Sequence, residues 1–171
     1  AEISATFNSN IDNNNNCLNG VDWYYGFDDP ALAGGSYTND SSLLSVVIHE
    51  ILHGLGVSSM VDSAGNLNSG YIDAYSRNLY DASTSKNWTA MSAAERGTST
   101  VNTSNLVWSG SNVNNSAAAL ALTDGINGGK VEMYAPNPHK SGSSVSHFNT
   151  DATPNEIMEP SYTEFLTTPG M

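Results

Sequence analysis

Two histidines and a glutamate have the spacing that metal-dependent hydrolysis requires. His49, Glu50 and His53 occur in the run His-Glu-Ile-Leu-His. Histidines four residues apart on a helix lie on one face, so both imidazoles can bind one zinc ion. Glu50 then projects beside the metal, where it can accept a proton from a zinc-bound water and pass it to the amine that leaves a cleaved peptide bond. The pattern indicates two zinc ligands and a catalytic general base.

The surrounding residues predict the helix that this chemistry needs. Ser41 and Ser42 can cap its start. Its apolar residues cover most of the circumference, which predicts a helix buried in the centre of the domain; they are Leu43, Leu44, Val46, Val47, Ile48, Ile51, Leu52 and Leu55. Gly54 and Gly56 are expected to end the helix with a left-handed turn after His53. The alternative is a buried helix whose histidines only hydrogen-bond to backbone, which leaves several polar groups to satisfy.

A catalytic zinc site also needs a third protein ligand and one open position. The two remaining histidines are His139 and His147. His139 lies between Pro138 and Lys140 in a polar segment, and we interpret it as a surface histidine while keeping it as the alternative third ligand. Taken alone, His147 is better explained as an exposed loop histidine.

From its second histidine onward, the motif resembles that of the metzincins, a clan of zinc metallopeptidases. Their motif continues through two residues to a glycine, here Gly56, and then to a third ligand three residues later. Ser59 occupies that last position, so the compact motif is absent. The chain instead resembles leishmanolysin-type members, in which a long insertion precedes the third histidine, and Ser146-His147-Phe148 looks like that later ligand.

The segment Asn-Glu-Ile-Met-Glu-Pro at residues 155–160 looks like the Met-turn of the same clan, a loop that passes beneath the metal. Met158 would be its methionine, although by itself it is better explained as an ordinary core residue. Tyr162 could stabilise the oxyanion, as a tyrosine does in some metzincins, but its offset differs and packing is the simpler interpretation. Asn149 and Asp151 are candidates to hold a ligand imidazole through its other nitrogen.

The resemblance is to the leishmanolysin-like group of secreted bacterial peptidases, and residues 41–60 and 143–162 carry it. It implies an α+β zincin fold in a single domain over residues 1–171. A small upper sheet and the active-site helix would occupy about residues 1–60, and an irregular lower lobe would occupy about residues 61–171. The implied activity is that of a zinc metalloendopeptidase, which binds an extended polypeptide along an edge strand of the upper sheet.

Composition limits the partners. Five Lys and Arg residues stand against seventeen Asp and Glu residues, giving a formal net charge of -12. Such a chain repels phosphate backbones and anionic lipid surfaces, so we expect neither nucleic acid nor membrane as a partner. The scarcity of lysine and the abundance of Asn, Ser, Thr and Gly are common in secreted bacterial proteins. We expect an extracellular, soluble monomer that acts on a polypeptide substrate.

The residues before the helix suggest strands and turns. Residues 2–7 alternate in a way that predicts a strand with Ile3, Ala5 and Phe7 on one face. The Asn-rich residues 8–16 predict a loop; they could bind Ca²⁺ through oxygen atoms, but their spacing matches no calcium-binding loop. Residues 21–27 predict a second strand, which turn residues such as Pro30 should end.

The pattern after the helix is weaker. We expect a short strand or helix within residues 70–80, a helical turn over 90–96, an alanine-rich helix over 116–122 and a short strand over 131–135, which Pro136 ends. The single cysteine, Cys17, cannot form an intrachain disulfide and fits a half-buried thiol.

Three other functions remain open at this point. A protein with the same ligands could use the metal only to stabilise its fold. A hydrolase with the same chemistry could act on a non-peptide amide, such as one in a cell wall. A carbohydrate-binding module would use Trp23, Trp88 and Trp108 as exposed aromatics, but it offers no explanation for His49 and Glu50.

Overall fold

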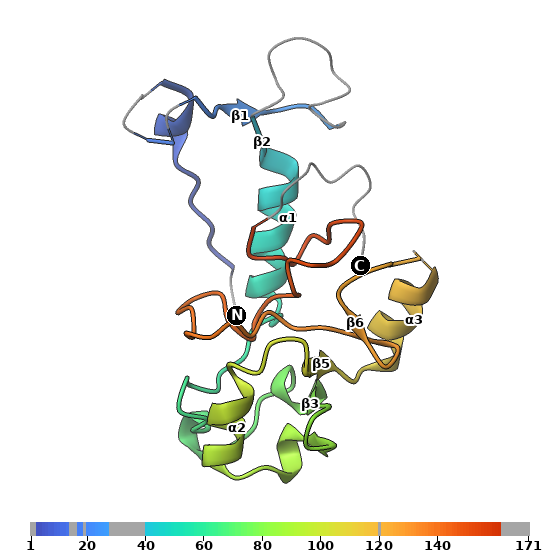
Figure 1. Ribbon diagram of the computed structural model, residues 1–171. Helices are drawn as coiled ribbons and strands as arrows, with labels where there is room; N and C mark the ends of the chain where they lie inside the picture. Colours follow the sequence, from blue (N-terminus) through green and yellow to red (C-terminus); the bar gives the residue numbers. More distant parts are fainter. Residues whose placement is uncertain (1–2, 14–16, 19, 28–39, 120, 162–171) are drawn as a thin grey trace.

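The computed structural model describes residues 3–13, 17–18, 20–27, 40–119 and 121–161, and it shows a mixed α+β arrangement (Figure 1). Within these ranges the chain forms three α-helices and three small sheets. Helix α1 (Leu43–Gly54) stands upright in the centre, with strands β1 (Trp23–Tyr24) and β2 (Ser41–Ser42) at its upper end. The other labelled elements lie lower in the same view. None of the described helices has the length and apolar character needed to cross a membrane.

Both ends of α1 follow from local sequence. Ser42 is the N-cap, and its hydroxyl accepts a hydrogen bond from Ser45 N at 3.3 Å. At the other end, Gly56 has φ +104° and its N–H donates to His53 O, while Val57 N donates to Leu52 O. This pair of bonds is a Schellman motif, which needs a left-handed residue just beyond the helix. The predicted cap and the predicted role of Gly56 are confirmed.

The prediction that α1 is buried all round is wrong. His49 is its only buried residue among those described, and Leu55, just past its end, is 70% exposed. Ile48 and Leu52 pack against the hydrophobic core on one side. The helix therefore lies at the boundary of the core, and it leaves another face, which carries Glu50, open to solvent.

The hydrophobic core lies mainly in the part of the chain that follows α1. Its largest buried side chains include Tyr75, Leu79, Trp88, Met91, Leu106, Met133, Phe148 and Met158. Burying each large apolar side chain contributes about 1.5–3 kcal/mol, so this cluster is a major source of stability. Trp88 is completely buried and its indole N–H donates to Ser99 Oγ, so the expectation that it is exposed is wrong. Trp23 and Trp108 are half-buried.

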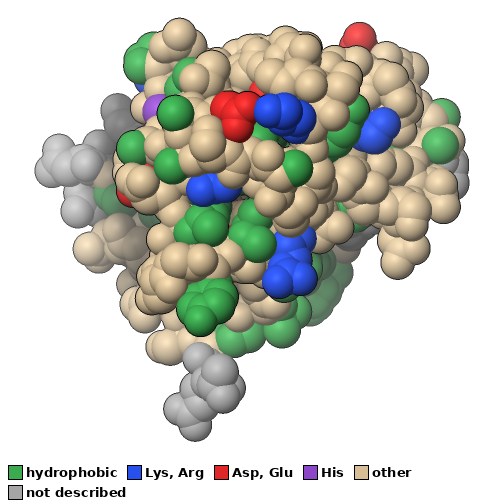
Figure 2. All heavy atoms as spheres, turned by 90° about the horizontal axis from the view of Figure 1, so that it is seen from below, with side chains coloured by type: hydrophobic (Ala, Val, Ile, Leu, Met, Phe, Trp, Pro, Cys, Tyr) green, Lys and Arg blue, Asp and Glu red, His purple; other side chains and the backbone are tan. Residues whose placement is uncertain are grey.

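Short sheets surround this core. Strand β3 (Leu79–Asp81) pairs antiparallel with β4 (Lys86–Asn87) on one side and β5 (Leu106–Trp108) on the other. Strands β6 (Ile126–Asn127) and β7 (Lys130–Val131) form a hairpin, and β1 pairs with β2 in parallel. The lower face is mostly uncharged, and its basic side chains lie in separate spots (Figure 2).

The remaining helices are short. Helix α2 (Ala93–Ser99) starts with a capping box, in which Ser92 and Glu95 each accept a hydrogen bond from the other's backbone N–H. Helix α3 spans Ser111–Ala119. Among the described residues, the 3-10 helices are η1 (Ser9–Asn13), η3 (Asn68–Gly70), η4 (Ser76–Asn78) and η5 (Trp88–Ala90).

Several predicted elements differ from the observed ones. Residues 3–7 belong to no strand, and η1 lies inside the predicted loop 8–16, so both predictions are wrong. A lone extended segment gains strand geometry only by pairing, and residues 3–7 hydrogen-bond to no other residue within the described ranges. The second strand is confined to β1, and the turn residues expected after position 27 lie outside the described residues.

Beyond α1, the elements are in the expected places with shifted ends. The predicted helical turn over 90–96 corresponds to η5 and α2, and α3 begins five residues before the predicted start at 116. The region 70–80 contains η4 and the start of β3. In the region 131–135, only Val131 belongs to a strand, and Glu132 and Met133 continue as isolated bridges.

Candidate metal centre

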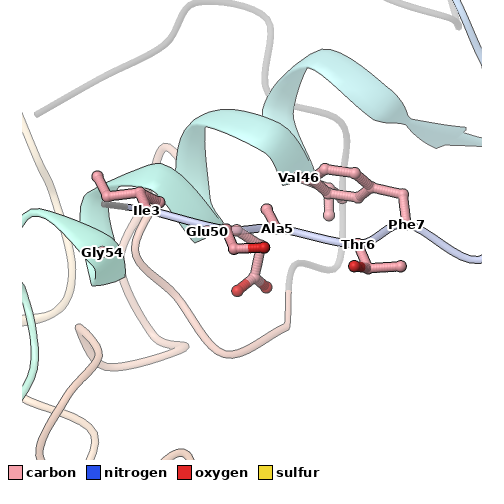
Figure 3. A pocket seen from close by; sticks show the side chains of 8 residues that line it. Ile3, Ala5, Thr6, Phe7, Val46, Glu50 and Gly54 are labelled. Carbon is pink, nitrogen blue, oxygen red and sulfur yellow. The ribbon is translucent and has the colours of Figure 1, made fainter. Parts of the chain in front are cut away.

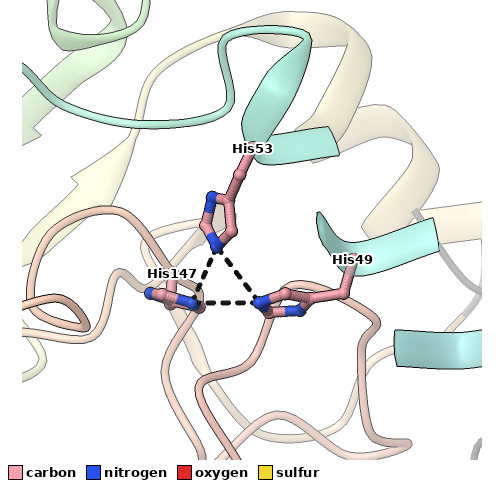
Figure 4. A group of neighbouring side chains, drawn as sticks. All are labelled: His49, His53 and His147. Atoms are coloured by element: carbon pink, nitrogen blue, oxygen red, sulfur yellow. Dashed lines mark hydrogen bonds between the residues drawn. The ribbon is translucent and has the colours of Figure 1, made fainter. Parts of the chain in front are cut away.

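The structure brings three predicted ligands together from two distant parts of the chain. His49 and His53 project from α1, and His147 comes from a loop about a hundred residues later (Figure 4). Their Nε2 atoms form a nearly equilateral triangle with sides of 3.1, 3.2 and 3.2 Å. Within the described ranges, no other set of three or more His, Cys, Asp or Glu side chains is close enough to share an ion.

The hydrogen bonds at the other ring nitrogens decide what this triangle can do. Each Nδ1 lies 2.7 Å from a backbone carbonyl oxygen: His49 on Ile157, His53 on Val57 and His147 on Ser143. A carbonyl can only accept, so each Nδ1 carries a proton, and in the neutral form of each ring the lone pair is then at Nε2. The three contacts drawn in Figure 4 then have no proton to share. Three converging lone pairs repel one another unless a cation lies between them.

The dimensions of the triangle suit a metal ion. Three nitrogens bound tetrahedrally at the usual zinc distance of about 2.0–2.1 Å stand about 3.3 Å from one another. The observed sides of 3.1–3.2 Å are close to that value. Backbone carbonyls on the outer nitrogens are also the normal way in which metal-ligating histidines are oriented. These histidines can therefore hold a metal ion, and zinc is one that fits.

Burial keeps His147 neutral. Burial is the main reason that the pKa of His147 is lowered to about 4, and the nearby rings of His53 and His49 lower it further, against the effect of the Ser143 carbonyl. His147 and His49 are buried and His53 is half-buried. A neutral imidazole is the form that binds metal, so His147 is in its ligating form over most of the pH range.

Serines tie the loop of His147 to the end of α1. Ser59 N donates to Ser146 Oγ at 3.1 Å, and Ser58 Oγ lies 3.3 Å from the same oxygen. Ser59 stands where the compact metzincin motif has its third ligand. In this chain it instead contacts Ser146, the neighbour of His147.

The predicted Met-turn lies against the same site. Met158 is buried, and its backbone oxygen accepts a hydrogen bond from Phe148 N at 2.9 Å. Its side chain lines an apolar cavity of about 160 Å³ together with Leu52, Phe148 and others. The loop therefore contacts both α1, through the Ile157 carbonyl on His49, and the residue that follows His147.

Glu50 lines a depression on α1. The carboxylate lines a cavity of about 590 Å³ between the helix and residues 3–7 (Figure 3). Ile3 lies at one end of this cavity, so close to Gly54 that a Cβ there would be 2.7 Å from its Cγ2 atom. Gly54 is the last helical residue, and it does not have the left-handed conformation predicted for it. Its lack of a side chain instead leaves room for Ile3.

Other candidates from the sequence have different positions. His139 is half-buried and does not join the cluster, and Tyr162 lies outside the described residues. Asn149 donates to Glu132 Oε2 and Asp151 Oδ2, so neither Asn149 nor Asp151 orients His147. The calcium hypothesis for residues 8–16 is untested, because residues 14–16 lie outside the described ranges.

Sequence reasoning missed the three carbonyls that orient the imidazoles. Every residue has a backbone carbonyl, so residue type gives no signal for Ile157 or Ser143. Val57 is different, because Gly56 predicts the turn that directs its carbonyl back to the helix end.

Comparisons of this chain with protein-family models, with curated proteins and with solved structures gave no match. The chemical interpretation therefore depends on the histidine cluster, its hydrogen bonds and the motif that supplies Glu50.

Proposed function

We propose that this chain is a zinc-dependent endopeptidase of the leishmanolysin-like metzincin type. The observation that carries the proposal is the convergence of three imidazole Nε2 atoms on one point, with Glu50 on the helix that supplies two of them. Imidazole nitrogens are preferred zinc ligands, and three protein ligands leave one coordination position open, as in catalytic zinc sites.

His49, His53 and His147 would hold the metal, whose bound form supplies a Lewis acid that polarises the attacking water and the peptide carbonyl. Glu50 would take the proton of that water and give it to the leaving amine, so the carboxylate ends the cycle unchanged. Its exposure supports this role, because an acceptor that exchanges protons with substrate must be reachable from solvent. The carbonyls of Ile157, Val57 and Ser143 would keep the three rings in place.

A polypeptide is the proposed substrate. Within the described part of the chain, residues 3–7 make no hydrogen bonds, and they border the cavity that contains Glu50. An extended backbone with free N–H and C=O groups can pair with a bound peptide by strand addition. The cavity runs between residues 3–7 and one side of α1, which is consistent with a peptide that binds on both sides of the cleaved bond. Secretion, a monomeric state and the two-lobed zincin fold belong to the same proposal.

The test combines metal content with peptide cleavage. Wild type should contain one zinc per chain and cleave a quenched peptide library. Glu50→Ala should retain zinc and lose activity by at least about 10²-fold, because it removes only the proton carrier. His147→Ala should lose both properties, while His139→Ala, the matched control, should keep both.

Other outcomes would overturn this proposal. Full zinc and activity without His147 would move the third ligand elsewhere and remove the family assignment. Tightly bound zinc in a folded protein that cleaves no peptide would indicate a metal-stabilised protein or a hydrolase of non-peptide amides.

A further inference from the structure

One tight turn supplies the acceptors that hold both halves of the metal centre. Its two central residues are Ile157 and Met158. The Ile157 carbonyl accepts from His49 Nδ1 at 2.7 Å, and the Met158 carbonyl accepts from Phe148 N at 2.9 Å. The first contact orients a ligand on α1, and the second fixes the residue next to His147. A rotation of the peptide groups in this turn would therefore move both contacts.

Glu159 closes this turn twice. Its backbone N–H donates to Glu156 O at 3.1 Å, the bond that defines a β-turn over residues 156–159. Its side-chain Oε1 accepts from Glu156 N at 2.5 Å. Glu159 therefore binds both the backbone N–H and the backbone C=O of Glu156, the first residue of the turn. The carbonyls of Ile157 and Met158 lie between Glu156 and Glu159 in the chain.

The cost of placing a carboxylate here supports a specific role. Glu159 is only 1% exposed, and its Oε2 atom is buried without a hydrogen-bond partner. Burial, together with the charges of Glu156 and Asp151, raises the pKa of Glu159 to about 7. Buried polar atoms without partners destabilise a protein, and each one in a native structure calls for an explanation. The geometry of the turn provides one.

We propose that Glu159 is a positioning residue for the metal centre, which acts through the 156–159 turn by fixing the carbonyl that orients His49 and the carbonyl that anchors Phe148 beside His147. This inference rests on the metal centre of the proposed function. Loss of Glu159 should therefore weaken metal binding, whereas loss of a buried acid that only stabilises the fold should not.

The experiment measures zinc affinity by competition with a chromophoric chelator, together with the visible absorption spectrum of the Co²⁺-substituted protein. Glu159→Ala should weaken zinc binding by about 10- to 100-fold, the usual cost of losing a group that supports a ligand. Glu159→Gln keeps an acceptor oxygen at the same reach, so its affinity should stay within about threefold of wild type. Glu159→Asp keeps the charge but is too short to reach Glu156 N, and it should behave like Glu159→Ala.

Asp81→Asn is the matched control. Asp81 is also buried and accepts hydrogen bonds from Ser83, Ser99 and Asn102, none of which belongs to the turn. This variant should lose thermal stability and keep the zinc affinity and Co²⁺ spectrum of wild type.

Three results would overturn the inference: full zinc affinity in Glu159→Ala, full affinity in Glu159→Asp should the alanine variant not fold, or an equal loss in Asp81→Asn. Wild type that binds no zinc would instead refute the proposed function. Wild type that binds zinc and cleaves peptides, with variants of unchanged affinity, would refute only the role of Glu159.

Discussion

Replacing Glu159 by glutamine should stabilise the protein in a pH-dependent way. The pKa of this carboxyl is raised to about 7, chiefly by burial and also by the charges of Glu156 and Asp151, whereas an unfolded chain has an ordinary glutamate pKa near 4.5. Below that ordinary value both states are protonated, and the carboxyl costs no stability. Between about pH 4.5 and 7 the unfolded state ionises first, so wild-type stability falls, and above about pH 7 the loss is complete.

The size of this effect follows from the shift. Each pKa unit corresponds to about 1.36 kcal/mol, so a rise from about 4.5 to about 7 corresponds to about 3 kcal/mol at pH 8. For a domain of this size, that difference raises Tm by about 6–12 °C. Glutamine does not titrate, so the advantage of Glu159→Gln should grow from pH 5 to pH 7 and then stay constant.

Thermal unfolding followed by circular dichroism between pH 4 and 8, with and without chelator, measures this advantage. The difference between variant and wild type cancels the titration of groups that do not interact with Glu159. An advantage that is equal at pH 4.5 and pH 8, or a variant that is less stable at pH 8, would refute the assignment of a buried, destabilised carboxylate at this position.

Three further expectations concern helix α2 and the surroundings of the site. The pKa of Glu95 is lowered to about 2, mainly by the hydrogen bond from Lys86 and then by the capping box, so Glu95→Gln should lower Tm at pH 7 and the deficit should vanish as the pH falls towards 2. Gly56→Ala places a side chain at φ +104°, which should cost about 1–2 kcal/mol in urea unfolding and weaken zinc binding by displacing the Val57 carbonyl. Ser146→Ala removes the acceptor of the Ser59 N–H and should cost about 1 kcal/mol, with a several-fold loss of zinc affinity in the chelator assay; an unchanged affinity would show that this contact does not place the loop.

Local sequence was enough for α1 and its ends. A serine cap, an apolar run and a glycine beyond the last turn act within a few residues of one another, and the structure confirms the cap at Ser42 and the turn at Gly56. The same reasoning failed for residues 3–7, because alternation predicts a strand only when a partner strand is present. It also failed for Trp88, whose burial depends on packing against residues far away in the sequence.

The sequence by itself determined that two histidines share one helical face with a glutamate beside them, and the resemblance predicted a distant third histidine and a Met-turn. The tertiary structure decided that His147 rather than His139 joins the cluster, and which nitrogen of each ring faces inward. Ring orientation depends on backbone carbonyls at positions 57, 143 and 157, and every residue type supplies such a carbonyl. Ile157 is 108 residues from His49 along the chain, so only folding brings its carbonyl to that ring. Ser143 is close to His147 in sequence, but it lies in an irregular loop whose conformation no sequence pattern predicts.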